Sequence, residues 1–235
     1  MKIMFDFSPN FSKKTRRKRD IKFVIIHYTG MQSEIESIKR LKNPRKKVSC
    51  HYLINRAGLV IQMVKENNVA WHAGKSKWKN YVNLNNNSIG IELVNKGHKF
   101  GYQNFSKKQI LSLINLCKNL KKKFSIKEEN FLGHSDIAPL RKNDPGEKFP
   151  WKKLSFHKIG TCLKKNKTKV KLNLQNREKL FFKNLKILGY RYFSIYKRNS
   201  KDKKIIRSFQ QHYLPDNVNG KIDQKTFETS YFLAH

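Results

Sequence analysis

The sequence predicts an α/β domain over residues 1–155, a basic linker over 156–175 and a small three-helix domain over 176–235. Two observations predict this organisation. Short β-branched and apolar runs alternate with amphipathic stretches up to about Trp151, which is the pattern of strands interleaved with helices. Beyond that point, a polar and basic segment precedes three short helical patterns. The hydrophobic content of 38% is enough for a packed core.

The strands of the first domain are predicted from short apolar runs. KFVIIHYTG at 22–30 is nearly continuous and rich in β-branched residues, which is typical of a buried strand. CHYLINRAGLVIQMV at 50–64 predicts two strands joined by a turn near Ala57 and Gly58. SIGIELVN at 88–95 predicts a further buried strand.

Two helices are predicted in the same domain. The first runs over 33–41. The second runs over 107–124, where Ser106 and Gln109 have the spacing of a capping box. Its apolar residues recur every three or four positions, as on one face of an amphipathic helix: Ile110, Leu113, Ile114, Cys117, Leu120 and Phe124.

The C-terminal domain is predicted from helical patterns over 176–188, 201–213 and 224–233. The last pattern follows the turn DNVNGKID, in which Asp223 is placed to cap the helix N-terminus. About 60 residues in three short helices can bury only a modest core.

The charge of the chain is strongly positive, with 52 Lys and Arg against 16 Asp and Glu, a net +36. Such a field favours polyanionic partners. Compositional drift explains it equally well, because Lys, Asn, Ile and Phe are all frequent and the basic residues are spread along the chain. No recognised nucleic-acid motif accompanies the charge, so no specific nucleic-acid partner is predicted.

The cysteines and the N-terminus bear on the compartment. Three cysteines, an odd number without C-x-x-C spacing, argue against a disulfide framework and are compatible with a reducing compartment. The first 20 residues lack the apolar region of a signal peptide, and no window reaches the length of a membrane span. The expected location is the cytoplasm. No oligomeric state is predicted.

Two histidines lie where predicted strands end, His27 within IIHYTG and His134 after NFLG. Histidines at strand ends can point into one cleft, and a catalytic zinc needs three such protein ligands and an open position. The third ligand can be Asp144, which precedes a Pro-Gly pair, or Asp136, which has H-x-D spacing with His134.

Two further residues have chemically useful positions. Glu92 interrupts an apolar strand, where it can serve as a general base with a pKa set by burial, or can pair with one of the many lysines. Lys142 lies two residues before Asp144, where an ammonium can stabilise an oxyanion, although a lysine in so basic a chain needs no special role.

Five segments resemble, in order and spacing, the zinc-dependent N-acetylmuramoyl-L-alanine amidases of the amidase-2 or peptidoglycan-recognition-protein fold. They run from about residue 20 to 151: VIIHYTG, VSCHYLINRAGLVIQMV, AWHAGKSKW, NNNSIGIELVN and GHSDIAPLRKNDPGEKFPW. The last is similar to the version in enterobacterial lipoprotein-type amidases. The resemblance implies a central mixed β-sheet flanked by helices. It also implies hydrolysis of the amide bond between N-acetylmuramic acid and L-alanine in peptidoglycan or muropeptides, in wall degradation or recycling.

The resemblance implies roles for five of these residues. His27, His134 and Asp144 match the family's Zn²⁺ ligands. Glu92 matches the acid that activates the attacking water, and Lys142 matches the lysine that stabilises the tetrahedral intermediate. All these positions are filled, which favours an enzyme over a non-catalytic peptidoglycan receptor on the same fold.

The resemblance also distributes the other histidines. His72, in AWHAG, falls where the family lines its substrate groove. Asp136 is expected to brace the loop or a ligand, and His51 is expected to be structural. Nothing singles out the remaining histidines, which are predicted at the surface: His98, His157, His212 and His235.

The C-terminal region resembles the three-helix peptidoglycan-binding domain. The matching segments are KIIRSFQQHY and DNVNGKIDQKTF, with Asn219 where the domain often has Asp. A wall-binding domain makes the periplasm or cell envelope the alternative location to the cytoplasm.

Overall fold

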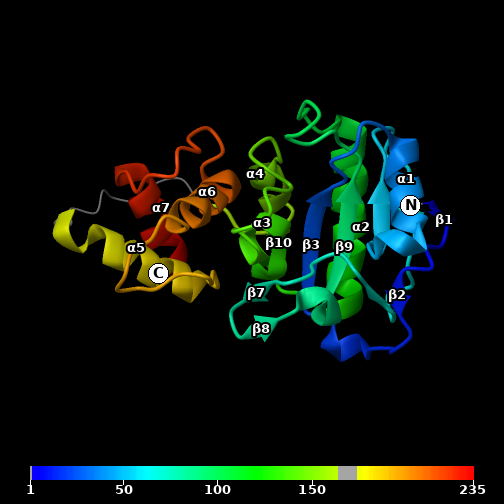
Figure 1. Ribbon diagram of the computed structural model, residues 1–235, viewed down its shortest axis with the longest axis horizontal. Coiled ribbons are helices and arrows are strands. Elements are labelled where there is room, and N and C mark those ends of the chain that lie inside the picture. The colour runs from blue at the N-terminus through cyan, green and yellow to red at the C-terminus, as the bar shows by residue number, and fades with distance from the viewer. Residues whose placement is uncertain (1, 164–173) are drawn as a thin grey trace.

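The computed structural model describes residues 2–163 and 174–235, so residues 164–173 of the predicted linker lie outside the described residues. The centre of the molecule is a six-stranded sheet (Figure 1) in the order β1-β5-β4-β9-β3-β10. Its strands are β1 (Ile3–Phe5), β3 (Phe23–Tyr28), β4 (Tyr52–Ile54), β5 (Val60–Gln62), β9 (Ser88–Leu93) and β10 (Phe131–Gly133).

The sheet is mixed. β4 and β5 form the antiparallel hairpin predicted over 50–64, whereas β10, β3, β9 and β4 run parallel to one another. The mixed sheet with flanking helices confirms the predicted fold class. Because the parallel strands end at one edge, residues at their carboxyl ends come together there.

Four short strands were not predicted, because two-residue strands carry no periodicity. They form two small sheets of paired strands: β2 (Phe11–Ser12) with β6 (Val69–Ala70), and β7 (Lys77–Trp78) with β8 (Tyr81–Val82).

The predicted helices of the first domain form as expected. α1 (Glu34–Lys42) begins after Ser33, and α2 (Lys107–Phe124) begins after Ser106, whose hydroxyl accepts a hydrogen bond from the Gln109 amide at 3.0 Å. The apolar face of α2 packs on the sheet against alternate strand residues such as Val24 and Ile26. Two short helices follow, α3 (His134–Ile137) and α4 (Trp151–Ser155).

The C-terminal helices are α5 (Leu174–Leu188), α6 (Asp202–Tyr213) and α7 (Gln224–Ala234). The Asp223 side chain caps α7 by accepting from the Thr226 amide at 2.8 Å, as predicted. The Gln210 side chain holds the preceding turn, because it donates to Asn219 Oδ1 and accepts from the Gly220 amide.

These helices lie at the β10 end of the sheet (Figure 1) and share one hydrophobic cluster with it. The cluster joins Phe23 and Ile25 of β3 to Phe181 of α5 and Phe209 of α6. The side of β3 that does not face α2 is therefore buried in a cluster that also includes residues of β10, α3 and β7 and extends to the C-terminal helices. Among the described residues, no helix is long and apolar enough to cross a bilayer.

Candidate metal centre

The carboxyl ends of three parallel strands bring the predicted site residues together. In the register of β3 and β9, His27 is paired with Glu92, and Gly133, the last residue of β10, is paired with Ile26. His134 therefore begins α3 directly beside His27. All three elements are buried in the core, so the platform is rigid.

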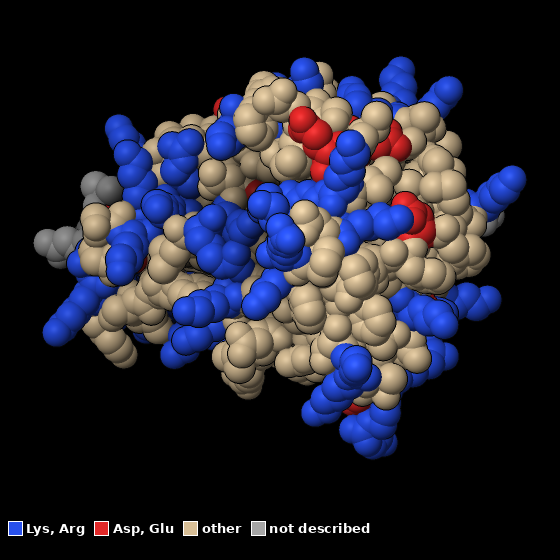
Figure 2. Space-filling model, turned by 45° about the vertical axis from the view of Figure 1, so that its right-hand side comes forward, with Lys and Arg blue, Asp and Glu red and all other residues tan. Residues whose placement is uncertain are grey.

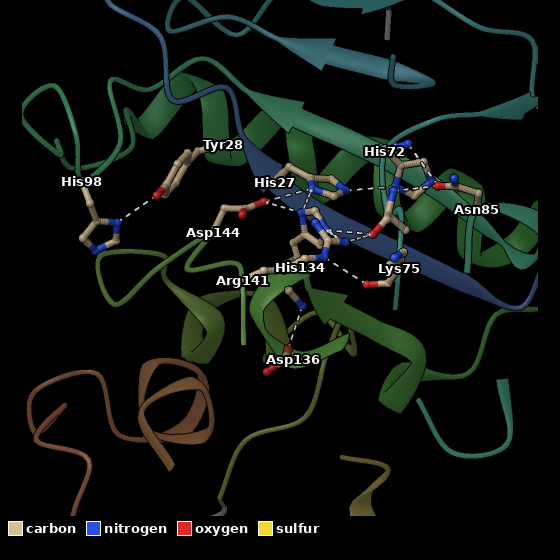
Figure 3. Close-up of polar contacts among 12 residues, drawn as sticks. His27, Tyr28, His72, Lys75, Asn85, His98, His134, Asp136, Arg141 and Asp144 are labelled. Carbon is tan, nitrogen blue, oxygen red and sulfur yellow. Dashed lines mark hydrogen bonds and ion pairs between the residues drawn. The ribbon is translucent and has the colours of Figure 1, made fainter. Parts of the chain in front are cut away.

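Three buried ligand atoms meet at this edge (Figure 3). His27 Nδ1 and His134 Nδ1 are 2.9 Å apart, and each lies 3.0 Å from Asp144 Oδ2. Zinc binds His nitrogen and carboxylate oxygen at about 2.0–2.2 Å, so atoms about 3 Å apart suit three ligands of one ion. Within the described residues, no other group of three His, Cys, Asp or Glu side chains has such an arrangement.

A chain of hydrogen bonds fixes which nitrogen of His27 faces this point. The Ser88 hydroxyl donates to the Leu84 carbonyl at 2.6 Å, so its oxygen must accept from His72 Nε2 at 3.2 Å. Burial and the neighbouring histidines keep the pKa of His72 well below its usual value, so His72 is neutral and its Nδ1 is an acceptor. His27 Nε2 therefore donates to His72 Nδ1 at 3.0 Å, and the lone pair of His27 Nδ1 is free for a metal.

Gly90 in β9 makes room for this chain. A Cβ atom at position 90 would lie 2.4 Å from the His72 ring. A glycine inside a strand often marks such a close approach, so Gly90 in SIGIELVN is a sequence signal for a packed ring. Asn85 adds to the fit, since its Oδ1 accepts from the backbone amides of His72 and Ala73.

His134 is oriented by a backbone carbonyl. Its Nε2 lies 3.1 Å from the Ala73 oxygen, which can only accept, and we assign the Nε2 proton to this contact. Arg141 Nη2 lies 3.2 Å from the same ring nitrogen and donates to the same carbonyl. A ring with its proton on Nε2 presents the lone pair of Nδ1 to the site. The Arg141 guanidinium also donates to the Ala73 and Lys75 carbonyls, which ties the loop over β10 to the segment before β7.

Burial and charge at the centre shift the pKa values of His27 and Asp144 towards the forms that bind a metal. Burial, followed by the nearby His134, lowers the pKa of His27 to about 4. Burial alone would raise the pKa of Asp144, but His134 and His27 together hold it well below its usual value. Near neutral pH, a carboxylate oxygen and two imidazole nitrogens thus converge on one point. This donor set fits a divalent cation such as zinc.

Glu92 and Lys142 lie around the same point. Glu92 is partly exposed, yet its Oε2 is buried without a partner in the described part of the chain. Burial and then Asp144 raise the pKa of Glu92 to about 8, while Lys142 opposes the rise. Lys142 is partly buried, and its charge also acts on His27. A proton acceptor and an ammonium therefore flank the three ligand atoms.

The structure places the His72 ring against the ring of His27, with 5.1 Å between the ring centroids. Its side chain is only 6% exposed, and both ring nitrogens are used within the chain. The sequence offered the AWHAG motif but no sign of this inward orientation other than Gly90.

Asp136 lies on the other side of the loop, 1% exposed. Its carboxylate accepts from the Gly133 amide, the Tyr190 hydroxyl and His212 Nδ1, each at 2.7 Å. The prediction of His212 at the surface is wrong: its side chain is buried at 5% exposure. A histidine that follows FQQ on a short helix gives no sequence signal of a partner 76 residues away.

An aromatic rim adjoins the metal ligands. His98, predicted at the surface, links Tyr28 and Glu147 through contacts of 2.9 and 3.1 Å. Tyr102 stacks on His98 and donates to the Pro145 carbonyl at 2.5 Å. This rim offers polar and π surfaces beside the ligands.

Comparisons with known proteins show the family to which the chain belongs. A family model described as N-acetylmuramoyl-L-alanine amidase matches residues 17–147. The amidase AmiD of Escherichia coli (strain K12) is 35% identical over 224 residues, covering 88% of this chain and 79% of AmiD. The 1,6-anhydro-N-acetylmuramyl-L-alanine amidase AmpD of Haemophilus influenzae is 33% identical over 164 residues, covering 62% of this chain and 86% of AmpD.

Solved structures are similar over nearly the whole chain. The E. coli AmiD complex with anhydro-N-acetylmuramic acid-L-Ala-D-γ-Glu-L-Lys has a TM-score of 0.79 at 30% identity, covering 94% of this chain and 91% of that chain. AmpDh3 of Pseudomonas aeruginosa, in complex with anhydromuramic pentapeptide, has a TM-score of 0.77 at 28% identity and covers 95% of each chain.

Proposed function

The chain belongs to the N-acetylmuramoyl-L-alanine amidase family, and we propose that it works with one zinc ion held by His27, His134 and Asp144. Its reaction is hydrolysis of the amide bond between N-acetylmuramic acid and the L-alanine of a peptidoglycan stem peptide. One observation carries the metal assignment: three buried ligand atoms, His27 Nδ1, His134 Nδ1 and Asp144 Oδ2, lie within 2.9–3.0 Å of one another. A bound zinc would supply a Lewis acid at the scissile carbonyl.

Glu92 is the proposed general base. It takes a proton from the attacking water and returns it to the leaving amine, so the same carboxyl serves both half-steps. Its register beside His27 and its unpartnered Oε2 support this role. The Glu92 pKa of about 8 applies to the metal-free site. A bound zinc ion would lower this pKa, because a nearby positive charge favours the carboxylate form.

Lys142 is the proposed oxyanion donor. Its ammonium is close enough to affect the pKa of both Glu92 and His27. An ammonium held beside the scissile carbonyl stabilises the negative charge that develops on its oxygen.

The proposed substrates are muropeptides, including 1,6-anhydro forms, since the solved relatives hold an anhydro-muramyl tripeptide and pentapeptide. Stem peptides carry carboxylates, and the face of the molecule in Figure 2 presents many Lys and Arg side chains and few Asp and Glu. Complementary charge raises the encounter rate of such substrates.

Two further assignments complete the proposal. His72, first expected to contact substrate, orients His27 through the Ser88 hydrogen-bond chain. The region 176–235 is a peptidoglycan-binding-like domain, an assignment supported by its FQ helix and by the Gln210 contacts that hold the NGKID turn.

The test is release of free stem peptide from soluble muropeptides by purified protein. Chelation should stop release and zinc should restore it. Glu92→Gln should keep zinc but lose release, whereas Asp144→Asn should lose both. A protein that binds zinc and muropeptide without any turnover would be a receptor and would contradict the proposal.

A further inference from the structure

We propose that Tyr190 and His212 of the C-terminal helices are positioning residues of the metal site. They hold Asp136 and so fix the backbone that carries His134 and Asp144. The inference rests on the ligand assignment above and goes beyond it, because it gives the C-terminal domain a part in the active site that is separate from wall binding.

The carboxylate of Asp136 is saturated. Oδ1 accepts from the Tyr190 hydroxyl, and Oδ2 accepts from His212 Nδ1 and the Gly133 amide, each at 2.7 Å. Two of these three donors belong to the C-terminal domain. A carboxylate with 1% exposure needs such donors, because burial without them is strongly unfavourable.

Asp136 acts on the ligands through the backbone. It sits in the first turn of α3, which His134 begins, and its bond to the Gly133 amide fixes the end of β10. The Ser135 amide donates to the Asp144 carbonyl at 2.8 Å, so the two ligand-bearing segments are joined at this turn. A shift of Asp136 therefore moves both ligands.

The His212 ring, which donates to Asp136, is itself fixed by two aromatic stacking contacts. Its ring stacks on Trp151 at 3.9 Å between centroids and 10° between planes, and on Tyr213 at 4.2 Å and 15°. Trp151 is the last residue of the segment 133–151, which carries His134 and Asp144. Through His212, α6 therefore contacts both Asp136 near the start of this segment and Trp151 at its end.

Two other residues of α6 also contact the segment 133–151. Gln211 donates to Glu147 at 3.3 Å, and Lys204 donates to the Leu140 carbonyl at 3.2 Å. The contacts of α6 thus run from one end of the ligand loop to the other.

The decisive variant is Tyr190→Phe in the full chain, which removes one hydroxyl and keeps the buried ring. Its matched control is Tyr213→Phe, which removes a hydroxyl that bonds to Thr161 instead of Asp136. The measurements are zinc affinity by competition with a chromophoric chelator, and kcat and KM on a soluble muropeptide. Loss of an outer partner of a metal site typically costs 10–100-fold in metal affinity, so we expect about a 10-fold loss in Tyr190→Phe.

A second pair of variants distinguishes the stacking contribution of the His212 ring from its hydrogen bond to Asp136. His212→Phe keeps the stack on Trp151 but loses the donor, whereas His212→Asn keeps a donor near the Nδ1 position. We expect His212→Phe to match Tyr190→Phe and His212→Asn to recover part of the loss. In each affected variant kcat should fall while KM stays within about twofold, because the variants leave the aromatic rim beside the ligands unchanged.

Three outcomes overturn the inference. Zinc affinity in Tyr190→Phe equal to that of Tyr213→Phe leaves no role for the Asp136 contact. A Tyr190→Phe protein that is unfolded without metal shows a purely structural role. A loss confined to binding of insoluble wall assigns the C-terminal domain to wall binding alone. In all three, zinc loss in Asp144→Asn would still support the proposed function, so the two failures are distinguishable.

Discussion

Asp136 and Asp144 lie in one loop, are both buried, and are both paired with histidine, yet their surroundings differ in one respect. Every neighbour of Asp136 directs a hydrogen atom at it. The neighbours of Asp144 are two imidazole nitrogens, and the other nitrogen of each ring contacts His72 or the Ala73 carbonyl. One carboxylate is satisfied by the protein, and the other completes a site that only a cation satisfies.

The difference shows that burial and sequence spacing do not identify a metal ligand. H-x-D spacing favours Asp136 as much as any other acid, and its exposure of 1% is lower than the 6% of Asp144. What decides is where the protons of the surrounding groups point, and that depends on residues remote in sequence such as Ser88 and Tyr190.

The largest predicted effect is on zinc affinity, and it separates Asp144 from Asp136. Asp144→Asn replaces a charged ligand by a neutral amide, and we expect zinc affinity to fall by more than about 100-fold, beyond the range typical of outer partners. Asp136→Asn should cost about 10-fold, because the ligand set is intact and only its support changes. Chelator competition on both proteins checks the order. An equal or larger loss in Asp136→Asn would reverse the comparison.

The sequence predicted the framework because the framework depends on local patterns. The capped α2 and the capped α7 follow from Ser106 and Asp223, and the hairpin β4–β5 follows from alternating runs around Gly58. The resemblance to the amidase segments indicated His27, His134 and Asp144, which the structure brings within bonding distance of one ion.

The support of the site could not be predicted, because its contacts join segments with no shared periodicity. His212 reaches Asp136 across 76 residues, and His72 reaches His27 across 45. Neither histidine has a motif that indicates its partner. The only local signal was Gly90, whose missing Cβ admits the His72 ring.

Gly90 gives the next prediction, which tests whether the hydrogen bond from His27 to His72 matters for zinc binding. Gly90→Ala places a methyl group where the His72 ring lies, so the ring must move and His27 Nε2 loses its acceptor. We expect about a 10-fold loss of zinc affinity. Cys117→Ala, a small change among the buried residues that pack α2 on the sheet, controls for altered core packing. Wild-type affinity in Gly90→Ala would show that His27 needs no fixed tautomer.

Glu92 supplies a third carboxyl, which is partly exposed, and a smaller predicted effect, on stability. Its Oε2 has no hydrogen-bond partner among the described residues, and burial followed by the charge of Asp144 raises its pKa from 4.5 to about 8. A carboxyl whose pKa is raised on folding favours the folded state below its unfolded pKa, and this stability is lost as the pH rises through the folded pKa. Between about pH 5 and 8, metal-free wild-type protein should therefore lose stability that metal-free Glu92→Gln keeps.

The expected difference at pH 8 is at least about 1 kcal/mol in favour of Glu92→Gln, reduced from the full shift because the side chain is partly exposed. Urea unfolding of both chelated proteins at several pH values measures it, since groups common to both cancel in the difference. Glu92→Gln should be the more stable protein and the inactive one, with turnover reduced about 100- to 10,000-fold when zinc is restored. Parallel stability curves would mean that Glu92 is already ionised in the metal-free protein and is stabilised as Asp136 is, by partners that satisfy it.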